Sequence, residues 1–169
     1  RYFSKHNKIK IIKENLIDQV YKEKSFFHKP FFSIEDNIVG ESYEAKLLKI
    51  KKYLNKNNSD LMFITAPENV AWLLNIRGFD NPNSPIPNCH LLIDKKNNPY
   101  LICEKKKAKK IILEKKIRKK QVIEFKNFEK LIEDLKGNKI IIDYKTCSLF
   151  FENILKKKFK ILKKEDPIY

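Results

Sequence analysis

The sequence predicts an α/β domain with a mixed β-sheet flanked by helices, preceded by an amphipathic helix and an extended linker. From residue 42 onward, short apolar runs alternate with segments whose apolar residues recur every three or four positions, which indicates strands alternating with helices. Turn-forming Gly, Pro and Asn residues separate these segments. The length of 169 residues suits one ordinary domain with a short element in front of it.

The segment in front of the domain contains one predicted helix and one predicted linker. Apolar residues at helical spacing predict an amphipathic helix over residues 8–22, which needs a partner surface for its apolar side. Aromatic residues, Pro30 and short polar pieces between Ser25 and Val39 predict an extended linker that ends at Gly40. The apolar positions of the helix are Ile9, Ile12, Leu16 and Val20.

The first half of the domain is predicted to contain two helices and three strands. Ser42 is a suitable N-cap for the first helix, and Pro67 fits the first turn of the second. Three prolines between Phe79 and Asn88 predict a rigid loop. The predicted elements are a helix over 42–54, a strand over 61–65, a helix from 67 that is closed by Gly78, and a hairpin of strands 89–94 and 100–103.

The second half continues the alternation. A basic stretch predicts a helix over 104–116, and Gly137 marks the end of a later helix. The remaining predicted elements are a strand over 121–125, a helix over 128–135, a strand over 139–143, a helix over 147–154 and a last strand over 159–162.

The net charge of the chain bears on nucleic acid as a partner, and its cysteines bear on the cellular compartment. The net charge is +16, with 34 lysines and only three arginines, whereas nucleic-acid recognition favours the planar guanidinium of arginine. Nucleic-acid binding therefore stays a less favoured alternative, which clustering of the lysines on one face would support. No apolar run approaches the roughly 18 residues of a membrane span. Three widely spaced cysteines fit reduced thiols and a cytoplasmic protein.

Several kinds of active site are excluded by what the chain lacks. With three widely separated glycines, neither a P-loop nor a dinucleotide-binding turn can form, and no serine hydrolase motif G-x-S-x-G is present. Cys89 and His90 are neighbours on a predicted strand, so their side chains point to opposite faces and cannot act as a thiol and its base. Asp94 and Asp143 follow strands, where a role in a turn or cap is expected.

The most distinctive stretch is NVAWLLNIRGFDNPNSP, from Asn69 to Pro85. Trp72 lies in a predicted buried helix, which favours a place in the core. Arg77 stands three residues before Asp80, a spacing that suits an ion pair pinning the proline-rich loop.

This stretch resembles the middle domain of the three-domain aminopeptidase P (Xaa-Pro aminopeptidase) family, in which a pattern of the form AWLLNxRGxDxPxNP recurs. The segment ENLIDQVYKEK resembles the helix that closes the first domain of the family, and Gly40-Glu41-Ser42 resembles the start of the second. Asp166-Pro167-Ile168 is similar to the run that leads into the catalytic domain. The residues that match the central pattern are Ala71 to Asn75, Arg77, Gly78, Asp80, Pro82 and Pro85.

The resemblance implies a creatinase-type fold and a domain plan. Residues 1–39 would be the end of a first creatinase-like domain plus a linker, and residues 40–169 a second creatinase-like α/β domain. A pita-bread metallopeptidase domain would follow Tyr169 and hold two divalent metal ions, typically manganese, on two aspartates, a histidine and two glutamates. The resemblance therefore implies no catalytic residue, metal ligand or cofactor in this chain.

The resemblance also implies a role for this part of the protein. It would pack on the catalytic domain in cis and restrict access to a cleft that binds peptides with proline at the second position. A homodimer is a further expectation. The loop residues expected to face the cleft are Arg77, Asp80, Asn83 and Pro85. The open alternative is a free-standing binding or scaffold protein of the same family, which an exposed apolar patch would favour.

Overall fold

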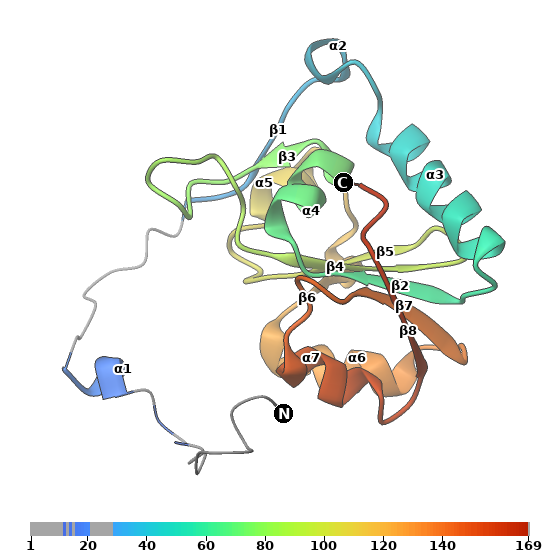
Figure 1. The fold of residues 1–169 in the computed structure, drawn as a ribbon. Coiled ribbons are helices and arrows are strands. Elements are labelled where there is room, and N and C mark those ends of the chain that lie inside the picture. The colour runs from blue at the N-terminus through green and yellow to red at the C-terminus, as the bar shows by residue number, and fades with distance from the viewer. Residues whose placement is uncertain (1–11, 13, 15, 21–28, 169) are drawn as a thin grey trace.

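The computed structural model describes residues 12, 14, 16–20 and 29–168 (Figure 1). Its centre is a six-stranded sheet in the order β6-β5-β4-β2-β7-β8. β2 lies between the antiparallel β4 and the parallel β7, so the predicted mixed sheet is confirmed. The strands are β2 (Leu61–Ile64), β4 (His90–Asp94), β5 (Pro99–Ile102), β6 (Val122–Ile123), β7 (Lys139–Asp143) and β8 (Lys160–Lys164).

Helices cover both faces of this sheet, as Figure 1 shows. Successive side chains of β2 point to opposite faces of the sheet. Met62 and Ile64 therefore pack in the first apolar cluster, and Leu61 and Phe63 pack in the second. The first face carries α3 (Tyr43–Lys56), α4 (Pro67–Leu74) and α5 (Lys109–Leu113), and the second carries α6 (Phe128–Asp134) and α7 (Leu149–Leu155).

The two helices at the start of the domain begin as predicted, but the second one ends early. The Ser42 side chain accepts a hydrogen bond from the backbone N–H of Ala45, and Pro67 occupies the first turn of α4. Helix α4 stops at Leu74 rather than near Gly78, because Asn75 adopts the left-handed conformation at its C-terminal cap. The next two residues form β3 (Ile76–Arg77), which pairs with β1 (Phe32–Ser33).

The expected linker is only partly extended. Helix α2 (Asp36–Val39) lies within it, and Gly40 closes that helix with a positive φ of 76°. The side chain of Phe31 is fully buried in the first apolar cluster. The described part of the linker therefore packs on the sheet domain.

The basic helix predicted over 104–116 is wrong in extent, since only α5 is helical there. The carbonyl of Lys107 accepts a hydrogen bond from the backbone N–H of Phe31, a partner outside any helix, which keeps the preceding residues in turns. The strand predicted over 121–125 is shorter as well. Two 3₁₀ turns, η2 (Lys119–Gln121) and η3 (Phe125–Asn127), flank β6.

Part of the predicted amino-terminal helix is present as α1 (Leu16–Val20). The side chains of Leu16, Ile17 and Val20 are exposed. The rest of the helix predicted over 8–22, and the start of the linker at residues 25–28, lie outside the described residues.

Candidate functional site

The proline-rich loop from Phe79 to Asn88 leads from β3 to β4 and lies at the end of the sheet where β2 finishes. A pocket of about 420 Å³ opens between this loop and the first turn of α4. Its walls combine carboxylates, amides and apolar side chains, which suits contact with a polypeptide surface. The lining residues are Pro67, Glu68, Asp80, Asn81, Pro82, Ile86 and Asn88.

Asp80 fixes the loop to the turn that follows β5. Its Oδ1 lies 2.5 Å from the Nζ of Lys107, and the two side chains are only 10% and 8% exposed. Its Oδ2 accepts a hydrogen bond of 2.7 Å from the backbone N–H of Asn88. One carboxylate therefore holds both the far end of the loop and a separate turn of the chain.

The base of the loop is closely packed. The backbone N–H of Gly78 donates to the carbonyl of Pro85 at 3.0 Å. A Cβ atom at Gly78 would lie 2.7 Å from the Cα of Pro87, closer than real contacts allow, so a side chain there would force the backbone apart. Glycine is required at this position by the close approach of two chain segments.

The predicted ion pair between Arg77 and Asp80 is wrong. The guanidinium of Arg77 instead donates to the carbonyls of Ile76 and Ala71, at 2.8 and 3.2 Å. Asp80 is paired with Lys107 instead, and the sequence does not distinguish this residue from the other lysines of its run. Arg77 thus ties β3 to the last turn of α4.

The four predicted loop residues do not form one cluster. Asp80 points inward to its ion pair, and Arg77 is half-buried behind the loop. Asn83 and Pro85 are exposed on the outer part of the loop. Of the residues that line the pocket, the site prediction included only Asp80. It missed Pro67 and Glu68, which come from α4, and Asn81, Ile86 and Asn88, which no motif marks.

Trp72 was expected in the core, yet it is 42% exposed. The reason is a buried lysine beneath it: the Nζ of Lys46 lies 4.1 Å from the centre of the Trp72 ring. The same ammonium donates to the Trp72 carbonyl at 2.9 Å and to Oδ1 of Asn75 at 2.6 Å. Burial lowers the pKa of Lys46 below its ordinary value. Lys46 thereby joins α3 to the end of α4.

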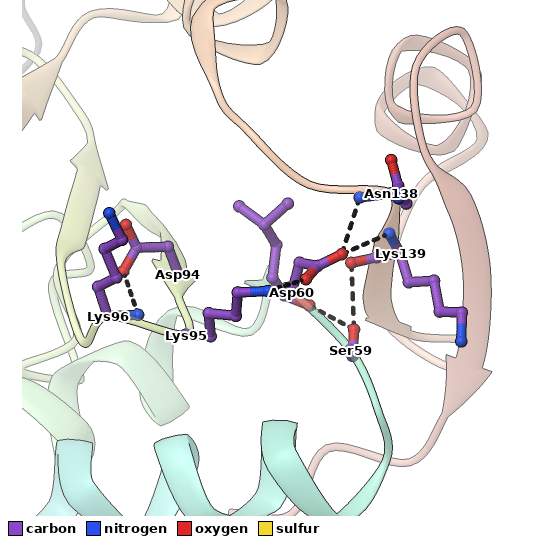
Figure 2. Close-up of polar contacts among 8 residues, drawn as sticks. Ser59, Asp60, Asp94, Lys95, Lys96, Asn138 and Lys139 are labelled. Carbon is purple, nitrogen blue, oxygen red and sulfur yellow. Dashed lines mark hydrogen bonds and ion pairs between the residues drawn. The ribbon is translucent and has the colours of Figure 1, made fainter.

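The opposite end of the sheet is closed by a network around Asp60, drawn in Figure 2. Its Oδ2 accepts from the backbone N–H groups of Asn138 and Lys139 at 2.8 and 3.2 Å, and its Oδ1 lies 2.5 Å from the Nζ of Lys95. The hydrogen bond from Asn138, followed by that from Lys95, lowers the pKa of Asp60 to about 2. These partners are the backbone at the start of β7 and a lysine of the turn between β4 and β5, so the network is architectural.

Two other sequence expectations are confirmed at the ends of strands. Asp94 accepts from the backbone N–H groups of Lys96 and Asn98, both at 2.9 Å, and so closes the hairpin turn. Asp143 accepts from the backbone N–H of Lys145 at 3.1 Å. Both aspartates act as turn residues.

Cys89 and His90 lie on opposite faces, as their adjacency predicts. Cys89 packs in the first apolar cluster, whereas the His90 ring lies 4.9 Å from that of Phe151 on the other side of the sheet. His90 also bonds through Nδ1 to the carbonyl of Thr65 at 2.9 Å, and burial lowers its pKa. No thiol and imidazole pair forms here.

Exposed lysines are spread over the described surface, and two groups of them lie at opposite edges of the sheet. One group surrounds α5 and β6, and the other surrounds the end of α7 and β8, the strand at the opposite edge. This distribution does not support the nucleic-acid alternative. The two groups are Lys105, Lys106, Lys109, Lys110, Lys119 and Lys120, and Lys156, Lys157, Lys158, Lys160, Lys163 and Lys164.

Two negative findings apply to the part of the chain that the structure describes. It contains no group of three or more His, Cys, Asp or Glu residues that could hold a metal ion. None of its helices is long and apolar enough to cross a membrane.

Comparison with known proteins gives consistent relatives. Xaa-Pro aminopeptidase 1 of Dictyostelium discoideum is 35% identical over 80 residues, which cover 43% of this chain and 13% of that protein. A probable Xaa-Pro aminopeptidase P of Laccaria bicolor is 31% identical over 84 residues, 48% of this chain and 13% of that protein. The matched part thus spans about an eighth of the length of these relatives.

Solved structures show the same fold. An X-prolyl aminopeptidase of Caenorhabditis elegans, described as a cytosolic enzyme with a di-nuclear active site, superposes with a TM-score of 0.73 at 17% identity. The superposition covers 90% of this chain and 26% of that one. A Xaa-Pro dipeptidase of Bacillus anthracis gives a TM-score of 0.51 at 13% identity, over 73% of this chain and 34% of its own.

A family model settles the relationship. The model of the Creatinase/Prolidase N-terminal domain matches residues 22–169, which is most of the chain. The mixed sheet with helices on both faces agrees with that assignment. The chain belongs to the creatinase/prolidase N-terminal domain family.

Proposed function

We propose that this chain is the non-catalytic N-terminal portion of a Xaa-Pro metalloaminopeptidase. The observation that carries the proposal is the combination of sequence relatives that are Xaa-Pro aminopeptidases with a match to an N-terminal domain family. The chain corresponds to only 26% of the nematode enzyme, which leaves the greater part of such a protein for catalysis.

In this proposal the chemistry belongs to a separate domain. Two divalent metal ions, typically manganese, would activate water against the bond between the first residue and a proline at the second position. The described residues offer no ligand cluster for such ions, so the proposal assigns the ions to the catalytic domain. The nematode relative is itself described as having a di-nuclear active site.

The domain plan is part of the same proposal. Residues 1–39 would come from the end of a preceding creatinase-like domain and its linker, and residues 40–169 would form the second domain. The burial of Phe31 means that the linker packs against this second domain.

The loop from Arg77 to Pro85 is the surface that we assign to the catalytic domain and its cleft. It is held rigidly by Asp80, and it presents Asn83 and Pro85 to the outside. The carboxyl-terminal segment passes close by, since Oδ2 of Asp166 accepts from the Nδ2 of Asn69 in α4 at 2.9 Å. A domain connected after Asp166 would therefore start beside the pocket between α4 and the loop.

Peptide-length selection tests this role in the complete protein. If the loop narrows the cleft, the double variant Asn83→Ala/Pro85→Ala should raise kcat/KM for long Xaa-Pro peptides relative to a tripeptide, with an unchanged Tm. The matched control is Asp134→Asn/Lys136→Ala, two exposed residues at the opposite end of the sheet, which should change neither quantity. An unchanged length preference in the loop variant would contradict the assignment.

Arg77 provides a second test of the same surface. Arg77→Ala removes the hydrogen bond to the Ala71 carbonyl that ties β3 to α4, together with the bond to the Ile76 carbonyl within β3, and should lower turnover or Tm of the complete enzyme. Wild-type kinetics together with a wild-type melting curve would count against a role for Arg77.

The proposal places the working enzyme in the cytoplasm, where thiols are kept reduced, because Cys89, Cys103 and Cys147 are free. The nematode relative is described as cytosolic. A homodimer is a further part of the proposal, and the mass of the complete protein in solution tests it.

A further inference from the structure

Two buried cysteines face each other across the antiparallel strands β4 and β5. The register pairs His90 with Ile102, so the next position outward places Cys89 opposite Cys103. Both thiols are free, both are fully buried, and both belong to the same apolar cluster on one face of the sheet. They are therefore neighbours in space although the hairpin separates them in sequence.

The type of pairing brings them close together. Pro99 faces Ile93 and has no N–H, so that pair cannot exchange backbone hydrogen bonds. Hydrogen-bonded and non-hydrogen-bonded pairs alternate along an antiparallel ladder. Counting four positions along the ladder places Cys89 and Cys103 at another non-hydrogen-bonded pair, where Cα atoms lie about 4.5 Å apart. Disulfides need Cα separations of about 4.4–6.8 Å.

We propose that Cys89 and Cys103 form an intramolecular disulfide when the protein reacts with hydrogen peroxide. One sulfur attacks an oxygen of the peroxide, the O–O bond breaks, and a sulfenic acid and water form. The second sulfur then attacks the sulfenic sulfur, so that the S–S bond forms, the S–O bond breaks and a second water leaves with the thiol proton. Two electrons pass from the two sulfurs to the peroxide.

The bond would form at the base of the proline-rich loop. Cys89 directly follows Asn88, whose backbone N–H donates to Asp80. Cys103 lies four residues before Lys107, the ion-pair partner of Asp80. A disulfide would therefore join covalently the two chain segments that the Asp80 carboxylate already holds together. This inference rests on the thiol geometry and is independent of the proposed function.

Burial sets the rate of the reaction. Burial raises the pKa of Cys103 to about 12 and raises that of Cys89 well above its ordinary value. Lys107 lowers the pKa of both thiols, and Asp80 raises it. Glu104 and Glu124 also raise that of Cys103. Since the thiolate is the nucleophile, the rate should rise roughly tenfold per pH unit below the pKa of Cys103.

Thiol counting in the full chain tests the proposal. The variant Cys147→Ser removes the half-buried third cysteine and leaves the pair. After treatment with hydrogen peroxide at about pH 8 and removal of the excess, the denatured protein should have lost two hydrogen atoms in mass. Neither remaining cysteine should react with N-ethylmaleimide, and peptide mapping should join Cys89 to Cys103 until a reductant is added.

The single variants Cys89→Ser and Cys103→Ser, in the same background, are matched controls that cannot form this bond. If the Cys147→Ser protein keeps two reactive thiols after prolonged treatment at about pH 9, the proposal is wrong. It is also wrong if the two sulfurs only gain oxygen, without a cross-link.

Discussion

Asp80 in the proline-rich loop and Lys107 in the turn after β5 form an ion pair of 2.5 Å, with both side chains nearly inaccessible to solvent. The pair joins two segments that no motif in the sequence links. A buried charge that loses its partner is costly, because it has given up its hydration without compensation. The pair therefore gives the loop its fixed position.

Lys107→Met tests this pair by leaving the Asp80 carboxylate buried beside an apolar side chain. We expect a loss of about 3–5 kcal/mol in the free energy of unfolding, measured by urea denaturation. The double variant Asp80→Asn/Lys107→Met removes both charges and should recover much of that loss. Lys110→Met, at an exposed ion pair with Glu114, is the control and should cost less than about 1 kcal/mol. Equal effects of Lys107→Met and Lys110→Met would contradict the account.

The lowered pKa of Asp60 leads us to expect that the free energy of unfolding depends on pH in the acid range. Its pKa is about 2 in the folded protein and 3.8 without these partners, so its ionised form contributes about 2 kcal/mol of stability. A lowered carboxyl pKa gives stability that is present above about pH 4 and is lost as the pH falls toward 2.

Asp60→Asn should consequently be less stable than the wild-type protein at pH 7, and the difference should vanish near pH 2. Denaturation curves at several pH values measure it. Asp134→Asn, at an exposed carboxylate at the same end of the sheet, is the control and should change the stability at pH 7 by less than about 0.5 kcal/mol. A constant difference for Asp60→Asn across this range would mean that ionisation is not the cause.

Because Lys46 on α3 contacts both the ring and the carbonyl of Trp72, we expect a change at Lys46 to alter the environment of Trp72. Lys46→Met removes the two hydrogen bonds to the Trp72 carbonyl and to Asn75, which leaves buried acceptors unpaired. We expect a loss of about 1–3 kcal/mol and a change in the fluorescence of Trp72, the single tryptophan. Lys49→Met, which breaks only an exposed pair with Glu41, should leave the fluorescence unchanged. Wild-type fluorescence and stability for Lys46→Met would rule out the coupling.

The order of the elements could be predicted from the sequence because local signals mark them. The apolar run within 139–143 predicted the strand that the structure has as β7, and Ser42 and Pro67 predicted where α3 and α4 begin. The prediction failed where a distant partner decides the local structure. The backbone N–H of Phe31 donates to the carbonyl of Lys107, and the basic helix is shorter as a result. No local sequence pattern indicates this contact.

In the candidate site, too, the features with a local sequence signal could be predicted and those that depend on a distant partner could not. The position of the loop followed from its three prolines, since these exclude regular structure. The partner of Asp80 could not be read from the sequence, because Lys107 is one of many lysines in its neighbourhood. Trp72 was misplaced because its exposure depends on Lys46, which lies 26 residues earlier on another helix.

The central claim is that this chain serves a Xaa-Pro aminopeptidase whose catalytic centre lies elsewhere. The most direct measurement compares the complete gene product with the 169-residue chain, each supplied with Mn²⁺ and with two peptides that differ only in proline or alanine at the second position. The account predicts that the complete protein releases the first residue from the proline peptide alone and that the 169-residue chain releases none. Release by the 169-residue chain, or no preference for proline in the complete protein, would contradict it.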